Sequence, residues 1–141
     1  MPTRTADAEW TGDLPSGSGR MRLGSGAFDG PFDFRSRMGD GAGTNPEELL
    51  GAAHAGCFSM ALTAQLGGAG FKPEQVKTHA QVHFGQVDGG WVIQRIDLTT
   101  EAKVPGATPE AFEEQAQAAK KGCPISRALA SVEITLDAKL V

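Results

Sequence analysis

TNPEELLGAAHAGCFSMALTAQLGGAG, residues 44–70, is the stretch of sequence that decides the fold. Between Glu48 and Lys72 no Asp, Glu, Lys or Arg occurs, and Cys57 lies near the middle. A long run that leaves almost no polar face is typical of a helix enclosed by other elements. We therefore expect a central helix that is buried on all sides. Its apolar residues are Leu49, Leu50, Ala52, Ala53, Phe58, Met60, Ala61, Leu62 and Leu66.

Both ends of this helix carry recognisable signals. Asn45 suits the N-cap, and Pro46 suits the first helical position, where a proline loses no hydrogen bond. Glu48, three residues after Asn45, completes the pattern of a capping box. The glycines at positions 67, 68 and 70 are expected to end the helix.

A membrane-spanning helix is the alternative for an uncharged run of this length. The run is interrupted by glycines and by polar residues, among them His54, Ser59, Thr63 and Gln65. It also has no flanking Lys/Arg clusters and no aromatic residues at a membrane interface. We therefore expect a core helix and no membrane partner.

Length and charge narrow the class of protein. A chain of 141 residues predicts one domain, residues 1–141, with room for a hydrophobic core. The net charge of -4 argues against a nucleic-acid partner. The N-terminus has no apolar segment of the kind found in secretory signals, so we expect a cytoplasmic protein. In that reducing compartment, two cysteines are more often redox-active than a structural disulfide.

Strand patterns flank the central helix on both sides. Residues 3–12 and 18–24 are predicted as short strands, and residues 76–87 and 91–102 as a hairpin that turns at Asp88, Gly89 and Gly90. A second helix from Thr108 to about Lys121, a short helix after Cys123, and a strand over residues 132–140 complete the chain. This order predicts an α+β fold with antiparallel sheets around the central helix, rather than alternating βαβ units.

A segment rich in phenylalanine precedes the central helix. Phe28, Phe32 and Phe34 lie among glycines and a proline, which predicts an irregular strand with Arg35 and Arg37 at its end. The glycine loop of residues 39–43 can bring backbone close to a ligand or simply turn the chain.

The two cysteines are the strongest chemical signal. A cysteine on an apolar helix is usually a small core residue, which is the plain interpretation of Cys57. Cys123, however, precedes Pro124 at the start of a helix, where amide donors and the helix dipole activate a sulfur. Such a pair fits a peroxidatic thiolate that is oxidised to a sulfenic acid and a resolving thiol that condenses with it.

A buried thiol needs a cation to ionise, because desolvation raises its pKa. An arginine, which is permanently charged, is the strongest counter-group, and a carboxylate would orient it. Several arginines are available: Arg20, Arg22, Arg35, Arg37, Arg95 and Arg127. Glu48 is expected to cap the helix, which leaves Glu47 for the arginine or for the helix dipole alone.

Histidines provide a weaker signal. His79 and His83 share one strand face, and His54 is one helical turn from Cys57, so a metal site could be imagined. No chelating motif spacing supports such a site, and histidines on a strand face are usually just solvated.

These motifs resemble a known family. NPEELLGAAHAGCFSMAL around Cys57 and GCPISRAL around Cys123 are similar to the two characteristic blocks of the osmotically inducible protein C/organic hydroperoxide resistance (OsmC/Ohr) family. AAHAGCFSMAL and the C-terminal SVEITLDAKLV resemble the osmotically inducible protein C branch in particular. The resemblance covers nearly the full chain, including WTGD at residues 10–13 and VPG at residues 104–106.

The resemblance implies an enzyme, a thiol peroxidase that reduces organic hydroperoxides to alcohols in oxidative or osmotic stress defence, without metal, haem or flavin. Cys57 matches the peroxidatic cysteine and Cys123 the resolving one. Arg37 matches the activating arginine and Glu47 its carboxylate partner, whereas Arg35 matches no position. The family implies an intertwined homodimer recycled by dithiols such as lipoylated proteins.

Helix geometry favours a dimeric site as well. Ten residues separate Glu47 from Cys57, which is ~15 Å along a helix axis at ~1.5 Å per residue. An arginine held by Glu47 is therefore expected to act on Cys57 of the other subunit, across a two-fold axis.

An apolar wall is expected to favour alkyl hydroperoxides over hydrogen peroxide. Its candidate substrate-binding residues are Phe28, Phe32, Phe34 and Met60, whereas Phe58 is expected in the core.

Two other functions compete with the enzyme. One is a non-catalytic dimer that binds an apolar ligand and has inert cysteines. The other is a thiol redox sensor that acts through a partner.

Overall fold

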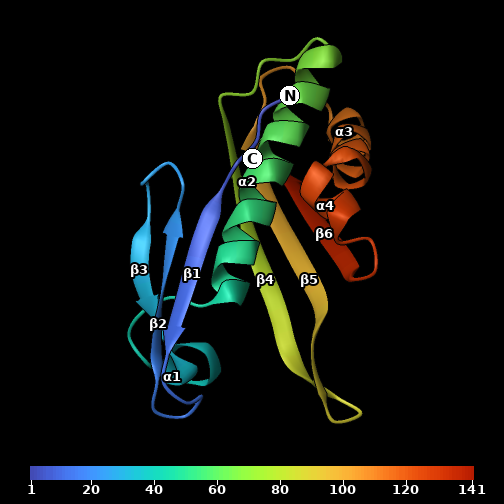
Figure 1. The fold of residues 1–141 in the computed structure, drawn as a ribbon. Coiled ribbons are helices and arrows are strands. Elements are labelled where there is room, and N and C mark those ends of the chain that lie inside the picture. Colours follow the sequence, from blue (N-terminus) through green and yellow to red (C-terminus); the bar gives the residue numbers. More distant parts are fainter. The chain divides into compact units, whose positions relative to one another are not determined.

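In the computed structural model, which describes residues 1–141, the chain begins with a small antiparallel sheet of order β1-β2-β3 (Figure 1). Its strands are β1 (Ala6–Thr11), β2 (Ser18–Leu23) and β3 (Asp29–Phe32). The two predicted N-terminal strands are confirmed, with shorter ends. Trp10 packs on Phe32 with their ring centroids 5.5 Å apart, which ties β1 to the far edge of this sheet.

The strand predicted around the phenylalanines is β3, but it ends at Phe32, and helix α1 (Phe34–Met38) begins two residues later. Asp33 caps it: the Ser36 amide donates to Asp33 Oδ1 at 2.7 Å, and the Asp33 amide donates to Ser36 Oγ at 2.9 Å. This reciprocal capping box starts a helix directly after β3. Arg35 and Arg37 therefore lie on a helix that the sequence did not predict, and not at the end of a strand.

Helix α2 (Pro46–Gly68) begins where the sequence indicates. The Glu48 amide donates to Asn45 Oδ1 at 2.7 Å, which confirms Asn45 as the cap. The Glu48 carboxylate, in contrast, accepts from Thr44 Oγ1 at 2.8 Å instead of closing a capping box with the Asn45 amide.

The helix is buried on one face only, so the expectation of burial on all sides was wrong for the single chain. Phe58, Leu62 and Leu66 are fully buried at helical spacing, whereas Met60 is 76% exposed. The apolar composition does not reveal this asymmetry, because both faces consist of apolar or small residues. By length and composition, α2 is also long and apolar enough to cross a membrane. Of its apolar 18-residue segment, 28% is buried in the structure.

The second sheet has the order β4-β5-β6 and consists of β4 (Gln75–Val87), β5 (Gly90–Lys103) and β6 (Glu133–Leu140). The β4–β5 hairpin is confirmed, with Asp88 and Gly89 at positive φ angles of 51° and 80° in its turn. Strand β6, however, pairs with β5 in parallel, so this sheet is mixed and not antiparallel. The connection through α3 (Pro109–Gly122) and α4 (Pro124–Ala128) is long enough to return the chain to the starting end of β5.

Side chains of α2, of the second sheet and of α3 form the core. Its fully buried members include Phe58, Leu62, Ile96, Phe112 and Ala116. The α+β fold class is therefore confirmed. The chain divides into two compact units, Met1–Leu49 and Leu50–Val141, and the single domain over residues 1–141 stays a prediction.

Substitutions on α3 can test the packing of the second unit. We expect Phe112→Ala to lower the free energy of unfolding by about 3–5 kcal/mol, because it leaves a cavity in the core. Glu114→Ala, on the exposed face of the same helix, is the matched control and should change it by less than about 0.5 kcal/mol. Chemical denaturation of both variants measures the difference. Equal stabilities would contradict the packing of α3 on this core.

Candidate active site

The two cysteines lie side by side although 66 residues separate them in the sequence. Cys57 belongs to α2, and Cys123 occupies the junction between α3 and α4. Both are free thiols, and their sulfur atoms are 2.9 Å apart. A disulfide needs about 2.05 Å between the sulfurs, so only a small movement would be required to form one.

The two thiols differ in accessibility. Cys123 is fully buried within the core, whereas Cys57 is partly exposed. A reagent that enters from solvent therefore reaches the sulfur of Cys57 first. The buried sulfur of Cys123 is placed to react with Cys57 rather than with an outside molecule.

The pKa values of the two thiols shift in opposite directions, and the accessible thiol is the one whose pKa rises. Burial raises the pKa of the Cys57 thiol, and its hydrogen bond with Cys123 raises it further, while the Ile125 amide lowers it. Burial also acts to raise the pKa of Cys123, but hydrogen bonds from Cys57 and from the amide and hydroxyl of Ser126 outweigh it and lower that pKa. Within one chain the accessible thiol is thus the harder one to ionise, and it needs a cation to become a nucleophile.

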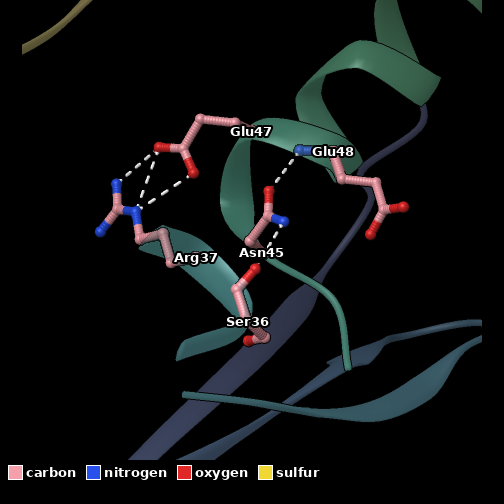
Figure 2. Close-up of polar contacts among 5 residues, drawn as sticks. All are labelled: Ser36, Arg37, Asn45, Glu47 and Glu48. Carbon is pink, nitrogen blue, oxygen red and sulfur yellow. Dashed lines mark hydrogen bonds and ion pairs between the residues drawn. The ribbon is translucent and has the colours of Figure 1, made fainter. Parts of the chain in front are cut away.

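Arg37 and Glu47 form an ion pair at the start of α2 (Figure 2). Arg37 Nη2 donates to Glu47 Oε1 at 2.6 Å, and Arg37 Nε lies 3.2 Å and 3.1 Å from the two carboxylate oxygens. The Glu47 side chain is 10% exposed and that of Arg37 is 39% exposed. A buried carboxylate thus binds a guanidinium that is partly exposed to solvent. The ion pair fixes the orientation of this guanidinium.

The structure therefore pairs Glu47 with Arg37 and not with Arg35. The side chain of Arg35 is exposed, and it forms no ion pair. Arg37 and Glu47 belong to the first unit, and both cysteines belong to the second. Of the four predicted catalytic residues, Cys57 therefore contacts Cys123, and Arg37 contacts Glu47. Their catalytic roles stay a prediction.

The predicted substrate-binding residues have different surroundings. Phe32 packs on Trp10, the ring of Phe28 covers Gly30, and Phe34 is 37% exposed at the start of α1. Met60 lines a surface cavity of about 420 Å³ together with Ser59, Thr63 and Val76. Phe58 is fully buried, which confirms it as a core residue.

Two residues beside the cysteines were not assigned a role from the sequence. His54 is fully buried on α2, and its Nε2 lies 2.7 Å from the hydroxyl oxygen of Ser126, which is itself buried. Ser126 in turn interacts with Cys123. The signal was present in the motifs AAHAGC and GCPIS, because each places a polar residue three positions from a cysteine, one helical turn away.

The strand histidines are far less enclosed. His83 Nε2 lies 2.7 Å from Asp97 Oδ2, and Arg95 joins the same carboxylate. Hydrogen bonds from Thr135 and His83 and the charge of Arg95 lower the pKa of Asp97 to about 2. No group of three or more His, Cys, Asp or Glu residues could hold a metal ion.

Two free thiols in contact, only one of them reachable from solvent, define a protein built for reversible thiol chemistry. The chain belongs to the OsmC-like protein family, whose model matches residues 39–137. The resemblance inferred from the two cysteine motifs is therefore confirmed.

Relatives of this family match over nearly the full chain. The chain is 46% identical to peroxiredoxin OsmC of Escherichia coli over 138 residues, covering 97% of this chain and 96% of the relative. It is 31% identical to an organic hydroperoxide resistance protein of Xanthomonas axonopodis pv. citri, covering 94% and 92%. The organic hydroperoxide resistance protein OhrB of Bacillus subtilis superposes with a TM-score of 0.73 at 27% identity, covering 96% and 98%.

The contact between the sulfurs makes a direct prediction. Mild oxidation of the reduced protein should form an intramolecular Cys57–Cys123 disulfide, because the sulfurs already lie 2.9 Å apart. Mass spectrometry should find the loss of two hydrogens and one cross-linked peptide. Cys123→Ser is the control, since it keeps Cys57 but cannot form this bond. Disulfides only between chains would contradict the pairing.

Proposed function

We propose that the protein is a cysteine-based peroxidase that reduces organic hydroperoxides to alcohols. The observation that carries the proposal is the contact between a solvent-accessible thiol, Cys57, and a buried thiol, Cys123. The names of the relatives, peroxiredoxin OsmC and organic hydroperoxide resistance protein, agree with this reaction. The chemistry uses only cysteine and needs no cofactor.

The first step occurs at Cys57. Its thiolate attacks the O–O bond of the hydroperoxide, so that one oxygen becomes a sulfenic acid on Cys57 and the other leaves with the alkyl group as an alcohol once it gains a proton. A nearby guanidinium both stabilises the thiolate and polarises the peroxide. We assign this role to Arg37, because Glu47 holds it by an ion pair.

The second and third steps restore the enzyme. The Cys123 thiol attacks the sulfenic sulfur, a disulfide forms, and the sulfenic oxygen leaves as water with the thiol proton. An external dithiol then opens the disulfide by exchange. A dithiol carried by a lipoylated protein is our proposed reductant, and the cytoplasm, in oxidative or osmotic stress defence, is the proposed setting.

A homodimer is the proposed form of the enzyme. The outer face of α2 exposes apolar and small residues in a continuous row, among them Ala53, Gly56, Met60 and Ala64. A row of this kind is suited to close contact with another helix, and a second copy of α2 in antiparallel orientation would cover it. In that arrangement Glu47 of one subunit lies close to Cys57 of the other subunit. Within its own subunit, Glu47 is ~15 Å from Cys57 along the helix axis. The same contact would keep the helix out of a membrane.

Substrate selectivity is proposed to depend on apolar contacts from Phe28, Phe32, Phe34 and Met60. An alkyl chain buried against such side chains gains about 25 cal/mol per Å² of apolar surface, which hydrogen peroxide cannot gain. The proposed enzyme should therefore favour alkyl hydroperoxides.

Single-turnover oxidation tests the reaction. Reduced protein mixed with tert-butyl hydroperoxide should lose both thiols and release one alcohol per Cys57–Cys123 disulfide, faster than with hydrogen peroxide. Cys57→Ser should abolish the reaction, whereas Cys123→Ser should stop at a sulfenic acid that a trapping reagent labels. Sluggish oxidation of both thiols in the unmodified protein, or full peroxide reduction by Cys57→Ser, would overturn the proposal and favour a binding protein.

Mixed dimers test the source of the arginine. Arg37→Met and Cys57→Ser should each be inactive alone, because one lacks the cation and the other the nucleophile. A dimer that combines one subunit of each should regain about half of the activity if Arg37 acts on Cys57 of the other subunit, since one complete site is then present. Differently tagged, co-expressed subunits allow that dimer to be purified and assayed. No activity in it would place the arginine and its cysteine in the same chain.

A further inference from the structure

His54 is the buried polar side chain that the proposed reaction does not use. It is fully buried on α2, and Ser126 Oγ lies 2.7 Å from its Nε2. Its other ring nitrogen, Nδ1, is buried and has no hydrogen-bond partner. A buried polar group with an incomplete set of partners is uncommon in folded proteins and calls for a functional explanation.

Ser126 connects His54 to the buried thiol. Cys123 occupies the N-cap of α4, and Ser126 is the third residue after it, in the first turn of the same helix. Ser126, through its amide and its hydroxyl, is among the groups that lower the pKa of Cys123. His54, Ser126 and Cys123 therefore form a buried chain of polar groups that ends at the sulfur, 2.9 Å from Cys57.

The number of available protons decides which group donates in each of these hydrogen bonds. The Ser126 hydroxyl has one proton, and when it donates to sulfur, its oxygen must accept from an N–H of His54. Nε2 then carries the proton and Nδ1 is left with a lone pair, which agrees with the missing partner of Nδ1. Burial lowers the pKa of His54, which favours the neutral ring with a single N–H.

We propose that His54 is a positioning residue for the resolving thiol: its Nε2–H holds the Ser126 hydroxyl so that the hydroxyl donates to the Cys123 sulfur as this attacks the sulfenic acid on Cys57. The proposal rests on the proposed peroxidase function and deepens its second step. In that step the S–H bond of Cys123 and the S–O bond of Cys57 break, the S–S bond forms, and the oxygen leaves as water. The sulfenic acid is itself the oxidant, so no other reactant is needed.

The experiment separates the two chemical steps. His54→Leu removes the N–H donor in a side chain of comparable size, and His54→Gln keeps an amide N–H near the position of Nε2. With tert-butyl hydroperoxide, sulfenic acid formation on Cys57 should proceed at the unmodified rate in both variants. Disulfide formation should slow about tenfold in His54→Leu, the effect of one hydrogen bond to a charged group, and recover in His54→Gln.

Two further measurements exclude a merely structural effect. Ser126→Ala should slow disulfide formation to a similar extent, and His54→Leu combined with Ser126→Ala should be no slower than either single variant, because both remove the same donated proton. In a Cys57→Ser background, His54→Leu should also reduce the ultraviolet thiolate absorbance of Cys123 at a fixed pH, and His54→Gln should restore it.

The outcomes distinguish the two proposals. If the unmodified protein forms neither sulfenic acid nor disulfide, the peroxidase function fails. If it forms both, and His54→Leu forms the disulfide at the unmodified rate, only the role of His54 is overturned. Equal slowing of both steps, or additive effects of His54→Leu and Ser126→Ala, would likewise overturn it, because each would indicate general damage to the core.

Discussion

The packing of one face of α2 on the second sheet is the constraint on which the rest of the second unit depends. Phe58, Leu62 and Leu66 anchor this face in the core, and Cys57 and His54 lie on the same helix within about one turn of Phe58. The core therefore fixes the rotation of α2, and this rotation points His54 inward while it leaves the sulfur of Cys57 at the boundary between core and solvent. Hydrophobic burial here sets the accessibility of a reactive atom.

The two thiols of the site have different neighbours, which shift their pKa values in opposite directions. The polar surroundings of Cys123 are built into its own unit, through Ser126 and the adjoining thiol. For Cys57, burial and the neighbouring thiol both raise the pKa and outweigh the Ile125 amide, which lowers it. The Arg37–Glu47 ion pair belongs to the first unit, with the carboxylate buried and the guanidinium partly exposed. Within the second unit, the polar surroundings therefore favour ionisation of the buried thiol over that of the accessible one.

The sequence was sufficient for the elements with strong local signals and for the residues in specific motifs. Asn45 and Thr108 mark helix starts that the structure confirms, and Asp88–Gly89 marks the hairpin. The helix at Phe34 was missed because the Asp33–Ser36 cap is a short signal among residues that favour strands. The parallel direction of β6 was missed because alternation fixes which face a strand buries but not its neighbour's direction. His54 and Ser126 could not be paired in advance, since only the tertiary fold brings together residues 72 positions apart.

The parallel pairing of β5 and β6 also has a consequence for how the chain acquires its reactivity. The crossover between these strands carries Cys123, and pairings between distant segments form late because closing a long loop costs entropy. Before the crossover docks, Cys57 and Cys123 are two unrelated thiols on a chain that is still being ordered. Their contact, and any chemistry that requires it, therefore depends on the docking of this crossover. The sulfur–sulfur contact thus reports the tertiary fold of the second unit, because no local element brings the two thiols together.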